Sequence, residues 1–262
     1  MDNKISNIDL ICSIVEKGLF STIDFTGYDE IIVDLDSVLS ILLRENLDFY
    51  SSDDKKILIS KILSSIRDFV SFYLTLSKVT LIYNMEKYKK FTEIYPGWCK
   101  ERQTRYTNES VKNLLHKFII KKLETAAEKS NKIDVFKTED SPILYIYDAL
   151  KYSDKKYLII SRDPHMICLF AYYDINIFNG RYTVNRNNYY LEKEYPHVHY
   201  TLIPACYLIA GIKRNEYSGI KGYSIKKASD LINKNKALTV KGELEQIKQM
   251  EQYKKIFYLN LK

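Results

Sequence analysis

Apolar runs alternate with amphipathic segments along the first part of the chain. Residues 30–43, EIIVDLDSVLSILL, begin as an apolar run suited to a buried strand and continue with apolar positions at helical spacing. Residues 53–76 have the pattern of a long amphipathic helix, and residues 78–83, KVTLIY, form a second apolar run. Strand, helix and strand in this order predict a βαβ unit.

The pattern continues with a further strand and then becomes mainly helical. Residues 156–161, KYLIIS, read as a buried strand, whereas the apolar segment at 143–150 suits a helix better. Short strands are expected between 171 and 200, around the turn-prone pair Asn179-Gly180. The pattern then predicts an apolar helix at 202–211, a glycine hairpin at 219–224, a helix at 225–233 and a charged, helical tail at 239–262.

Polar residues follow each of the predicted strands. Asp34 and Asp36 come after the first apolar run, Asn84 after the second, and Asp163 after the third. In open α/β sheets the carboxyl ends of the strands are where ligands and catalytic groups collect. The sequence therefore predicts a functional site that contains Asp34 and Asp163.

Composition narrows the class of protein and of partner. The chain has 262 residues, enough for one sizeable α/β core, and its net charge of +7 favours a polyanion as partner without demanding one. Its four cysteines are far apart and lack zinc-ligand spacing, which favours free thiols in a reducing compartment. No signal peptide, no 18-residue apolar stretch and no nucleotide-binding glycine motif is present, so we expect a cytoplasmic protein without a membrane partner.

A basic and aromatic segment lies between the second and third strands. Residues 86–105 are dense in Lys, Arg, Tyr, Phe and Trp and are broken by Pro96-Gly97, and residues 110–129 continue as a cationic helix. Cations that alternate with aromatic rings suit a single nucleic-acid strand, although such a charge run can also be a solvated face. We treat residues 86–129 as a candidate arch.

The most specific motif lies at residues 202–232, LIPACYLIAGIKRNEYSGIKGYSIKKASDLI. It resembles the helix-three-turn-helix element of the flap endonuclease and bacterial or phage 5′-nuclease family. The matching positions are Ala210, Gly211, Gly219, Ile220, Gly222, Lys226 and Ala228. A glycine hairpin and a helix N-terminus aim backbone N–H groups at phosphate, and lysines add charge. The alternative is an ordinary packing corner between two helices.

Further segments resemble the same family in the same order. They are Asp34 after the first strand, Asn84 after the second, FTEIYPGWCKER at 91–102, KTED at 137–140 and LIISRDPHMICL at 158–169. The resemblance implies an α/β fold: a PIN-like 5′-nuclease core with a central, mostly parallel sheet, a helical arch and a C-terminal helix-three-turn-helix element. It also implies a core over residues 1–200, including the arch, and a DNA-binding region over residues 201–262.

The resemblance implies a metal site that has lost several of its carboxylates. The family's acids are kept at Asp34, Asp140 and Asp163, with Asp36 and Glu139 close by, and these five are the candidate ligands of Mg²⁺ or Mn²⁺. Acids of the family are replaced by Asn84, Lys137, His165, Ile212 and Asn215. The second metal position is therefore expected to be lost or weakened, which leaves a single ion. Glu216, one position beyond Asn215, could restore an acid if the loop shifts.

Three functions remain open on these grounds. The first is a structure-specific 5′-nuclease-like protein that binds branched or RNA-primed DNA and hydrolyses it weakly; its catalytic residues would be Asp34, Asp140, Asp163 and Arg102. The second is an inactive pseudonuclease that binds DNA or acts as a scaffold in replication. The third is a PIN-like ribonuclease, which would have no need of the glycine hairpin. The candidate DNA-binding residues are Lys89, Lys90, Lys100, Arg102, Gly219, Lys221, Gly222, Lys226 and Lys227. A phage origin, with the host cytoplasm as location, is expected from the resemblance.

Overall fold

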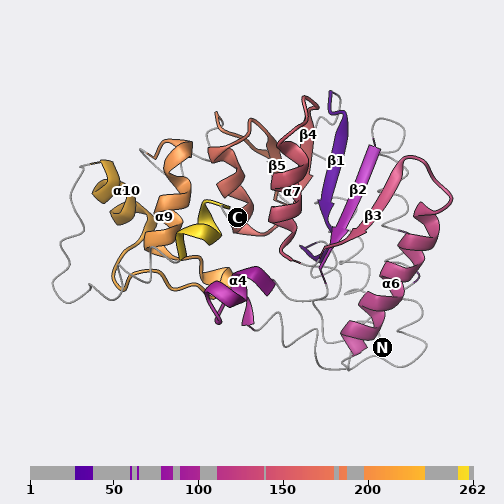
Figure 1. Ribbon diagram of the computed structural model, residues 1–262, viewed down its shortest axis with the longest axis horizontal. Coiled ribbons are helices and arrows are strands. Elements are labelled where there is room, and N and C mark those ends of the chain that lie inside the picture. Colours follow the sequence, from indigo (N-terminus) through magenta and orange to yellow (C-terminus); the bar gives the residue numbers. More distant parts are fainter. Residues whose placement is uncertain are drawn as a thin grey trace, which may run out of the picture.

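One six-stranded sheet forms the centre of the computed structural model (Figure 1). Its strands lie in the order β3-β2-β1-β4-β5-β6, and all neighbours are parallel except β5 and β6. The strands are β1 (Glu30–Asp34), β2 (Lys78–Tyr83), β3 (Ile133–Lys137), β4 (Tyr157–Ile160), β5 (Asn176–Phe178) and β6 (Thr183–Val184). The predicted α/β class with a mostly parallel sheet is confirmed.

The strand order reverses between β1 and β4. From β1 the chain builds outward through β2 to β3, and it then returns to add β4 and β5 on the other side of β1. In doubly wound sheets the crevice at such a reversal, outside the carboxyl ends of the strands, is the usual ligand site. We call the side of the sheet where the strands end, with Asp34 at the end of β1, the carboxyl edge. The opposite side, where the strands begin, is the amino edge.

The structure describes the greater part of the chain. The described residues are 27–37, 60, 64, 78–84, 89–100, 111–138, 140–179, 183–187, 198–233 and 253–259. The predicted helix at 53–76 and most of the predicted tail lie outside them, as do much of the candidate arch and two candidate site residues, Arg102 and Glu139.

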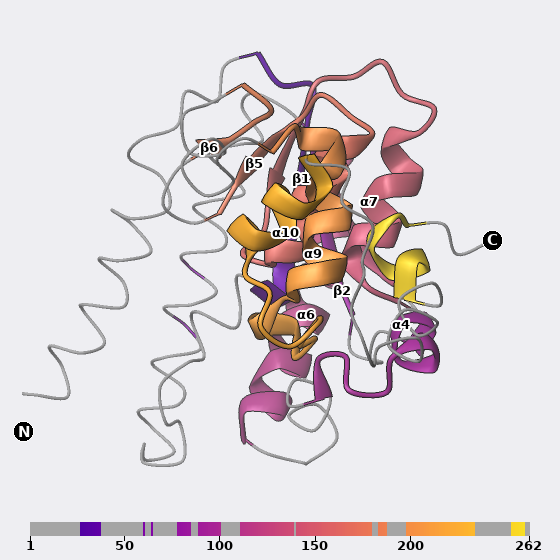
Figure 2. The same ribbon diagram turned by 90° about the vertical axis from the view of Figure 1, so that its left-hand side faces the viewer.

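Helices surround the sheet on several sides (Figures 1 and 2). Helix α6 packs beside the edge strand β3, while α9 packs on the 3₁₀ helix η2 and on α10. The described helices are α4 (Lys89–Ile94), α6 (Val111–Ala127), α7 (Pro142–Leu150), α9 (Ile203–Ala210) and α10 (Ile225–Asn233), with the 3₁₀ helices η2 (Pro164–Ala171), η3 (Tyr200–Leu202) and η4 (Lys213–Asn215).

Burial explains which strands the sequence predicts. All residues of β1 and β4 are buried, as expected for central parallel strands that are covered on both faces and therefore have unbroken apolar runs. Strand β3, IDVFK, has no buried residue because it lies at the edge of the sheet. It lacks an apolar run, and the sequence pattern did not predict it.

The helix-three-turn-helix element is formed by residues 203–233. Gly211 ends α9 with φ +84°, and Gly219 has φ +61° in the turn that follows. A Cβ atom on Gly219 would lie 2.5 Å from the backbone N of Gly211 and from the backbone O of Ile209, so only glycine fits there. The Ile220 N–H donates to the same Ile209 carbonyl at 2.7 Å. We refer to residues 203–233 as the hairpin element.

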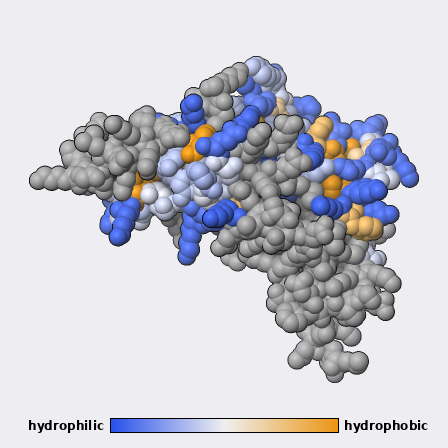
Figure 3. Space-filling view, turned by 60° about the horizontal axis from the view of Figure 1, so that its bottom comes forward, coloured by the Kyte–Doolittle hydropathy of each residue, from blue (hydrophilic) through white to orange (hydrophobic). Residues whose placement is uncertain are grey.

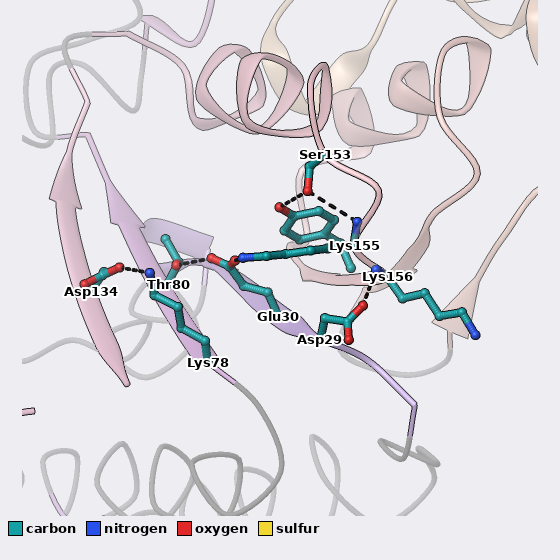
Figure 4. A network of polar contacts seen from close by, with 9 residues as sticks. Asp29, Glu30, Lys78, Thr80, Asp134, Ser153, Lys155 and Lys156 are labelled. Atoms are coloured by element: carbon teal, nitrogen blue, oxygen red, sulfur yellow. Dashed lines mark hydrogen bonds and ion pairs between the residues drawn. The ribbon is translucent and has the colours of Figure 1, made fainter. Parts of the chain in front are cut away.

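Charged side chains at the amino edge form a network of opposite charges (Figure 4). Glu30, at the start of β1, accepts hydrogen bonds from the Thr80 hydroxyl at 2.6 Å and from the Lys155 ammonium at 3.1 Å. Lys78 of β2 pairs with Asp134 of β3. These contacts join three neighbouring strands to the loop before β4.

A hydrophobic cluster of described residues extends from the sheet to the hairpin element. It includes Ile159 of β4, Ile209 of α9, Ala228 of α10 and Phe257 near the C-terminal end of the chain. Residues of both predicted parts, 1–200 and 201–262, contribute to this cluster. The division between them stays a prediction.

Candidate active site

Two acids meet at the reversal of strand order. Asp34 ends β1, and Asp163 follows β4 by three residues. Ser161 lies between them: its hydroxyl donates to Asp34 Oδ2 at 2.6 Å and accepts from the Asp163 N–H at 3.1 Å. The topology of the sheet thus brings Asp34 and Asp163 together at the carboxyl edge.

The Asp34 carboxylate is buried and strongly held by hydroxyl and amide donors. The Ser37 hydroxyl donates to Oδ2 at 2.5 Å, and the Ser37 N–H donates to Oδ1 at 3.1 Å. Burial raises the pKa of Asp34 from 3.8 to about 6, and the negative charge of Asp36 adds to this; hydrogen bonds from Ser161 and Ser37 oppose the rise. The hydrogen bonds from Ser161 and Ser37 therefore offset only part of the free energy that it costs to bury the negative charge of Asp34.

Asp36 is held by the end of β2. The backbone N–H of Asn84, the residue that follows β2, donates to Asp36 Oδ2 at 2.6 Å. Asn84 is buried, whereas Asp36 is half-buried. Asn84, which stands where the family has an acid after the second strand, thus donates its backbone N–H to Asp36.

Asp140 connects the end of β3 to α4. Its Oδ2 accepts the Lys90 N–H at 2.7 Å, and its Oδ1 accepts the Ser141 N–H at 2.8 Å. Burial raises the pKa of Asp140, while these two backbone hydrogen bonds lower it. Each of its oxygens therefore accepts a backbone N–H, in an arrangement suited to fixing the start of the candidate arch. We call residues 89–100, the described part of this start, the arch base. Lys137, two residues before the undescribed Glu139, is exposed.

His165 faces away from the acids. Its ring is fully buried at 5.1 to 5.6 Å, centroid to centroid, from the rings of Trp98, Phe91 and Phe257, and its Nε2 donates to the Ile256 carbonyl at 3.1 Å. Burial lowers the pKa of His165 to about 4, against the opposing charge of Asp163, so the ring is neutral at pH 7. His165 contacts the acids through its backbone N–H, which donates to Asp163 Oδ1 at 3.0 Å.

Two further replaced positions lie in the loop before the hairpin. Ile212 is buried in the hydrophobic cluster and pairs through its backbone with Tyr217. Asn215 is fully buried, and its Nδ2 lies 3.1 Å from Asp163 Oδ1 and 3.4 Å from Oδ2. Of the replaced acids, Asn215 thus reaches the site with its side chain, whereas Ile212 and His165 point into the core.

The described residues do not fit a pair of divalent ions. Within the described ranges, no three His, Cys, Asp or Glu side chains gather as a metal would require. Magnesium is usually held by one or two carboxylates and water, and the oxygens of Asp34 and Asp163 accept hydrogen bonds from protein groups. The roles predicted for Asp34, Asp36, Glu139, Asp140 and Asp163 as ligands stay predictions.

The candidate DNA-binding residues lie at two places. Lys90 and Lys100 are exposed at the base of the arch, and Lys221, Gly222, Lys226 and Lys227 are exposed on the hairpin element. The Lys227 ammonium donates to the Gly222 carbonyl at 3.0 Å, which braces the turn. Arg102 and the side chain of Lys89 lie outside the described residues.

Sequence reasoning missed the serines that organise the acids. Ser37 and Ser161 each donate to Asp34, and Ser161 also links Asp34 to Asp163. The signal was present, because each serine stands within three residues of a strand-end acid. Short hydroxyl side chains at such positions bond to neighbouring groups rather than to water.

Comparisons with solved structures identify the fold, although no protein-family model and no curated protein matches the sequence. A bacteriophage T5 flap endonuclease, solved as a pseudo-enzyme–product complex with DNA and metal ions, gives a TM-score of 0.59 at 16% identity; the match covers 89% of this chain and 87% of that one. A T5 protein co-crystallised with metal ions gives 0.58 at 17% identity, with the same coverage. The catalytic core of Rad2 with a DNA substrate gives 0.52 at 12% identity and covers 90% of this chain and 71% of that one. The chain thus has the fold of the flap endonuclease and 5′-nuclease family, as the sequence motifs predicted.

Proposed function

We propose that this protein binds branched or RNA-primed DNA, and that its hydrolysis of phosphodiester bonds is weak or absent. The observation that carries the proposal is the hairpin element, whose turn is closed by backbone contacts that tolerate only glycine at position 219. Solved proteins of this fold hold DNA. Such an element suits a duplex backbone, because it presents backbone N–H groups and cations without reading bases.

The charge of the hairpin element supports a phosphate partner. Helix α10 begins at Ile225 with Lys226 and Lys227 in its first turn and with no acid there. A helix N-terminus carries a partial positive charge, to which the two ammonium groups add. Lysines at this end weaken an isolated helix, so their presence favours an anionic ligand.

One face of the described part also suits a polar partner. In the view from below, hydrophilic residues dominate and hydrophobic ones form small separate spots (Figure 3). The large hydrophobic side chains exposed among the described residues are Phe118, Phe136 and Tyr152. None of the described helices is long and apolar enough to cross a bilayer. The compartment stays a prediction.

The test measures binding to a 5′-flap DNA by fluorescence anisotropy, at several salt concentrations and in the presence of EDTA. Lys226→Glu should weaken binding about tenfold and reduce the salt dependence, because a phosphate contact is lost and a repulsion is added. Lys156→Glu makes the same charge change at an exposed residue of the amino edge and should leave affinity nearly unchanged. Equal losses in both variants would show only general charge attraction.

Weak hydrolysis, as opposed to none, is favoured because Asp34, Asp36 and Asp163 are close enough for the charges of the latter two to raise the pKa of Asp34. Clusters of perturbed carboxylates are typical of catalytic sites. The test is cleavage of flap and RNA-primed substrates with Mg²⁺ or Mn²⁺. Cleavage that disappears in Asp163→Ala would support a nuclease. Binding without cleavage over both metals would support the pseudonuclease.

A further inference from the structure

Asn215 connects three segments that are far apart in the sequence. Its side-chain amide donates to the Asp163 carboxylate after β4, and its backbone carbonyl accepts the Cys99 N–H at the base of the arch at 2.9 Å. Its own backbone N–H donates to Ile212, within the loop of the hairpin element, at 3.0 Å. The hairpin element, the arch base and the carboxyl edge therefore meet at one fully buried residue.

The orientation of the amide follows from hydrogen-bond chemistry. A carboxylate offers only acceptors, so the Asn215 group that faces Asp163 has to be the NH₂ donor. The reversed amide would place Oδ1 against the Asp163 oxygens, which is repulsive. In the assigned orientation Oδ1 is buried and meets no donor within the described residues. Asn215 thus leaves one polar atom unsatisfied while its nitrogen serves Asp163.

The contact completes a continuous path of hydrogen bonds. Asp34 accepts from Ser161, Ser161 accepts from the backbone of Asp163, Asp163 accepts from Asn215, and Asn215 accepts from Cys99. The path runs from the centre of the sheet to the arch base. Its side-chain donors, a hydroxyl and an amide, are neutral, so the carboxylates are held together by the chain's own groups.

We infer that Asn215 is a positioning residue that fastens the hairpin element and the arch base to the carboxyl edge, in the place where a divalent ion could otherwise join carboxylates. Asparagine differs from aspartate by one NH₂ group in place of an oxygen. That difference turns a repulsive acceptor beside Asp163 into a donor, and it removes one ligand from any ion. The carboxyl edge consequently needs no metal to keep its arrangement. The inference concerns stability and holds whether or not the protein binds DNA.

The central experiment compares the melting temperatures of wild type and Asn215→Asp in EDTA and in Mn²⁺ at pH 7.5. The wild-type melting temperature should be the same in both buffers. Asn215→Asp should melt about 5 °C lower in EDTA, because two buried carboxylates then face each other with no donor between them. In Mn²⁺ the variant should recover most of this loss, because two adjacent carboxylates can now share an ion.

Asn187→Asp is the matched control, since it makes the same chemical change at an exposed residue. Its melting temperature should stay within about 1 °C of wild type in both buffers. Asn215→Ala gives a second measurement if Asn215→Asp does not fold: it should melt about 5 °C lower than wild type and show no response to Mn²⁺.

Two outcomes would overturn the inference. If the wild type is stabilised by Mn²⁺ as much as Asn215→Asp is, an ion and not the amide holds this edge. If Asn215→Asp and Asn215→Ala both melt with the wild type in EDTA, Asn215 fastens nothing. These measurements contain no DNA, so a failure of the proposed DNA binding would leave them unaffected.

Discussion

The two ends of strand β1 carry buried carboxylates in opposite electrostatic surroundings. At the amino edge, Glu30 lies 3.1 Å from the Lys155 ammonium and also accepts the Thr80 hydroxyl. At the carboxyl edge, Asp34 has the negative charges of Asp36 and Asp163 near it and is held by serine donors. The two carboxylates are four residues apart on one strand.

The difference separates a structural arrangement from one that costs stability. Opposite charges at the amino edge attract one another and hold neighbouring strands together. This structural role is enough to explain why charged residues stand at these positions. Like charges gathered in a buried place destabilise the fold, and such arrangements are typical of functional sites. The carboxyl edge thus resembles a site for a ligand, even though its donors are now the chain's own groups.

The largest expected effect is at the carboxyl edge. Asp34→Asn removes a buried charge whose pKa is raised from 3.8 to about 6, a difference worth about 3 kcal/mol when the group is fully ionised. Because the folded state binds the proton more tightly than the unfolded state, wild type loses this stability as the pH rises from about 4 through 6. We therefore expect Asp34→Asn to gain stability relative to wild type over that range.

Urea unfolding of both proteins in EDTA at pH 4.5 and pH 8 measures this gain. The difference in free energy of unfolding, variant minus wild type, should be about 2 kcal/mol more favourable to the variant at pH 8 than at pH 4.5. A difference that does not change with pH would show that Asp34 is not strained by its neighbours.

A smaller effect of opposite sign is expected at the amino edge. Glu30→Gln makes the same change, carboxylate to amide, but removes an attraction to Lys155 while leaving an oxygen for the Thr80 hydroxyl. The Lys155 side chain is 52% exposed, so the loss should be about 0.5–1 kcal/mol. The same unfolding experiment at pH 8 gives the value. Stabilisation here would erase the contrast between the two ends of β1.

The smallest effect is expected at the pair of Lys78 and Asp134, whose side chains are 42% and 34% exposed. Asp134 raises the pKa of Lys78, but solvent screens a pair this accessible. Asp134→Asn should lower the free energy of unfolding by less than about 0.5 kcal/mol, and added salt should reduce that difference further. A larger loss would mean that edge strand β3 depends on this pair.

The parts of the fold that the sequence predicts are those with a strong local pattern. Residues 78–83 and 225–233 match β2 and α10 residue for residue, because an unbroken apolar run and an amphipathic repeat leave little choice. Strand β3 was not predicted, since an exposed edge strand has no apolar run. It is a strand because its backbone pairs with that of β2.

The site was predictable in its location and less so in its chemistry. Spacing placed Asp34 and Asp163 at one edge, because parallel strands end together. Spacing could not tell that both Asp140 oxygens accept backbone N–H groups, since Lys90 comes from fifty residues away. Nor could spacing predict that the ring of His165 packs against Phe91 and Phe257, because one lies far before it in the sequence and the other far after it.

The contact between His165 and the backbone of Ile256 has a consequence for how the chain is made. The two residues are separated by 91 positions, so at about 5–20 residues per second a ribosome needs roughly 5–20 s to supply the second after the first. During that interval the aromatic ring of His165 and its neighbours lack the cover of Phe257. The core around His165 therefore closes only after residue 257 has been made, and until then this face of the ring lacks its aromatic cover.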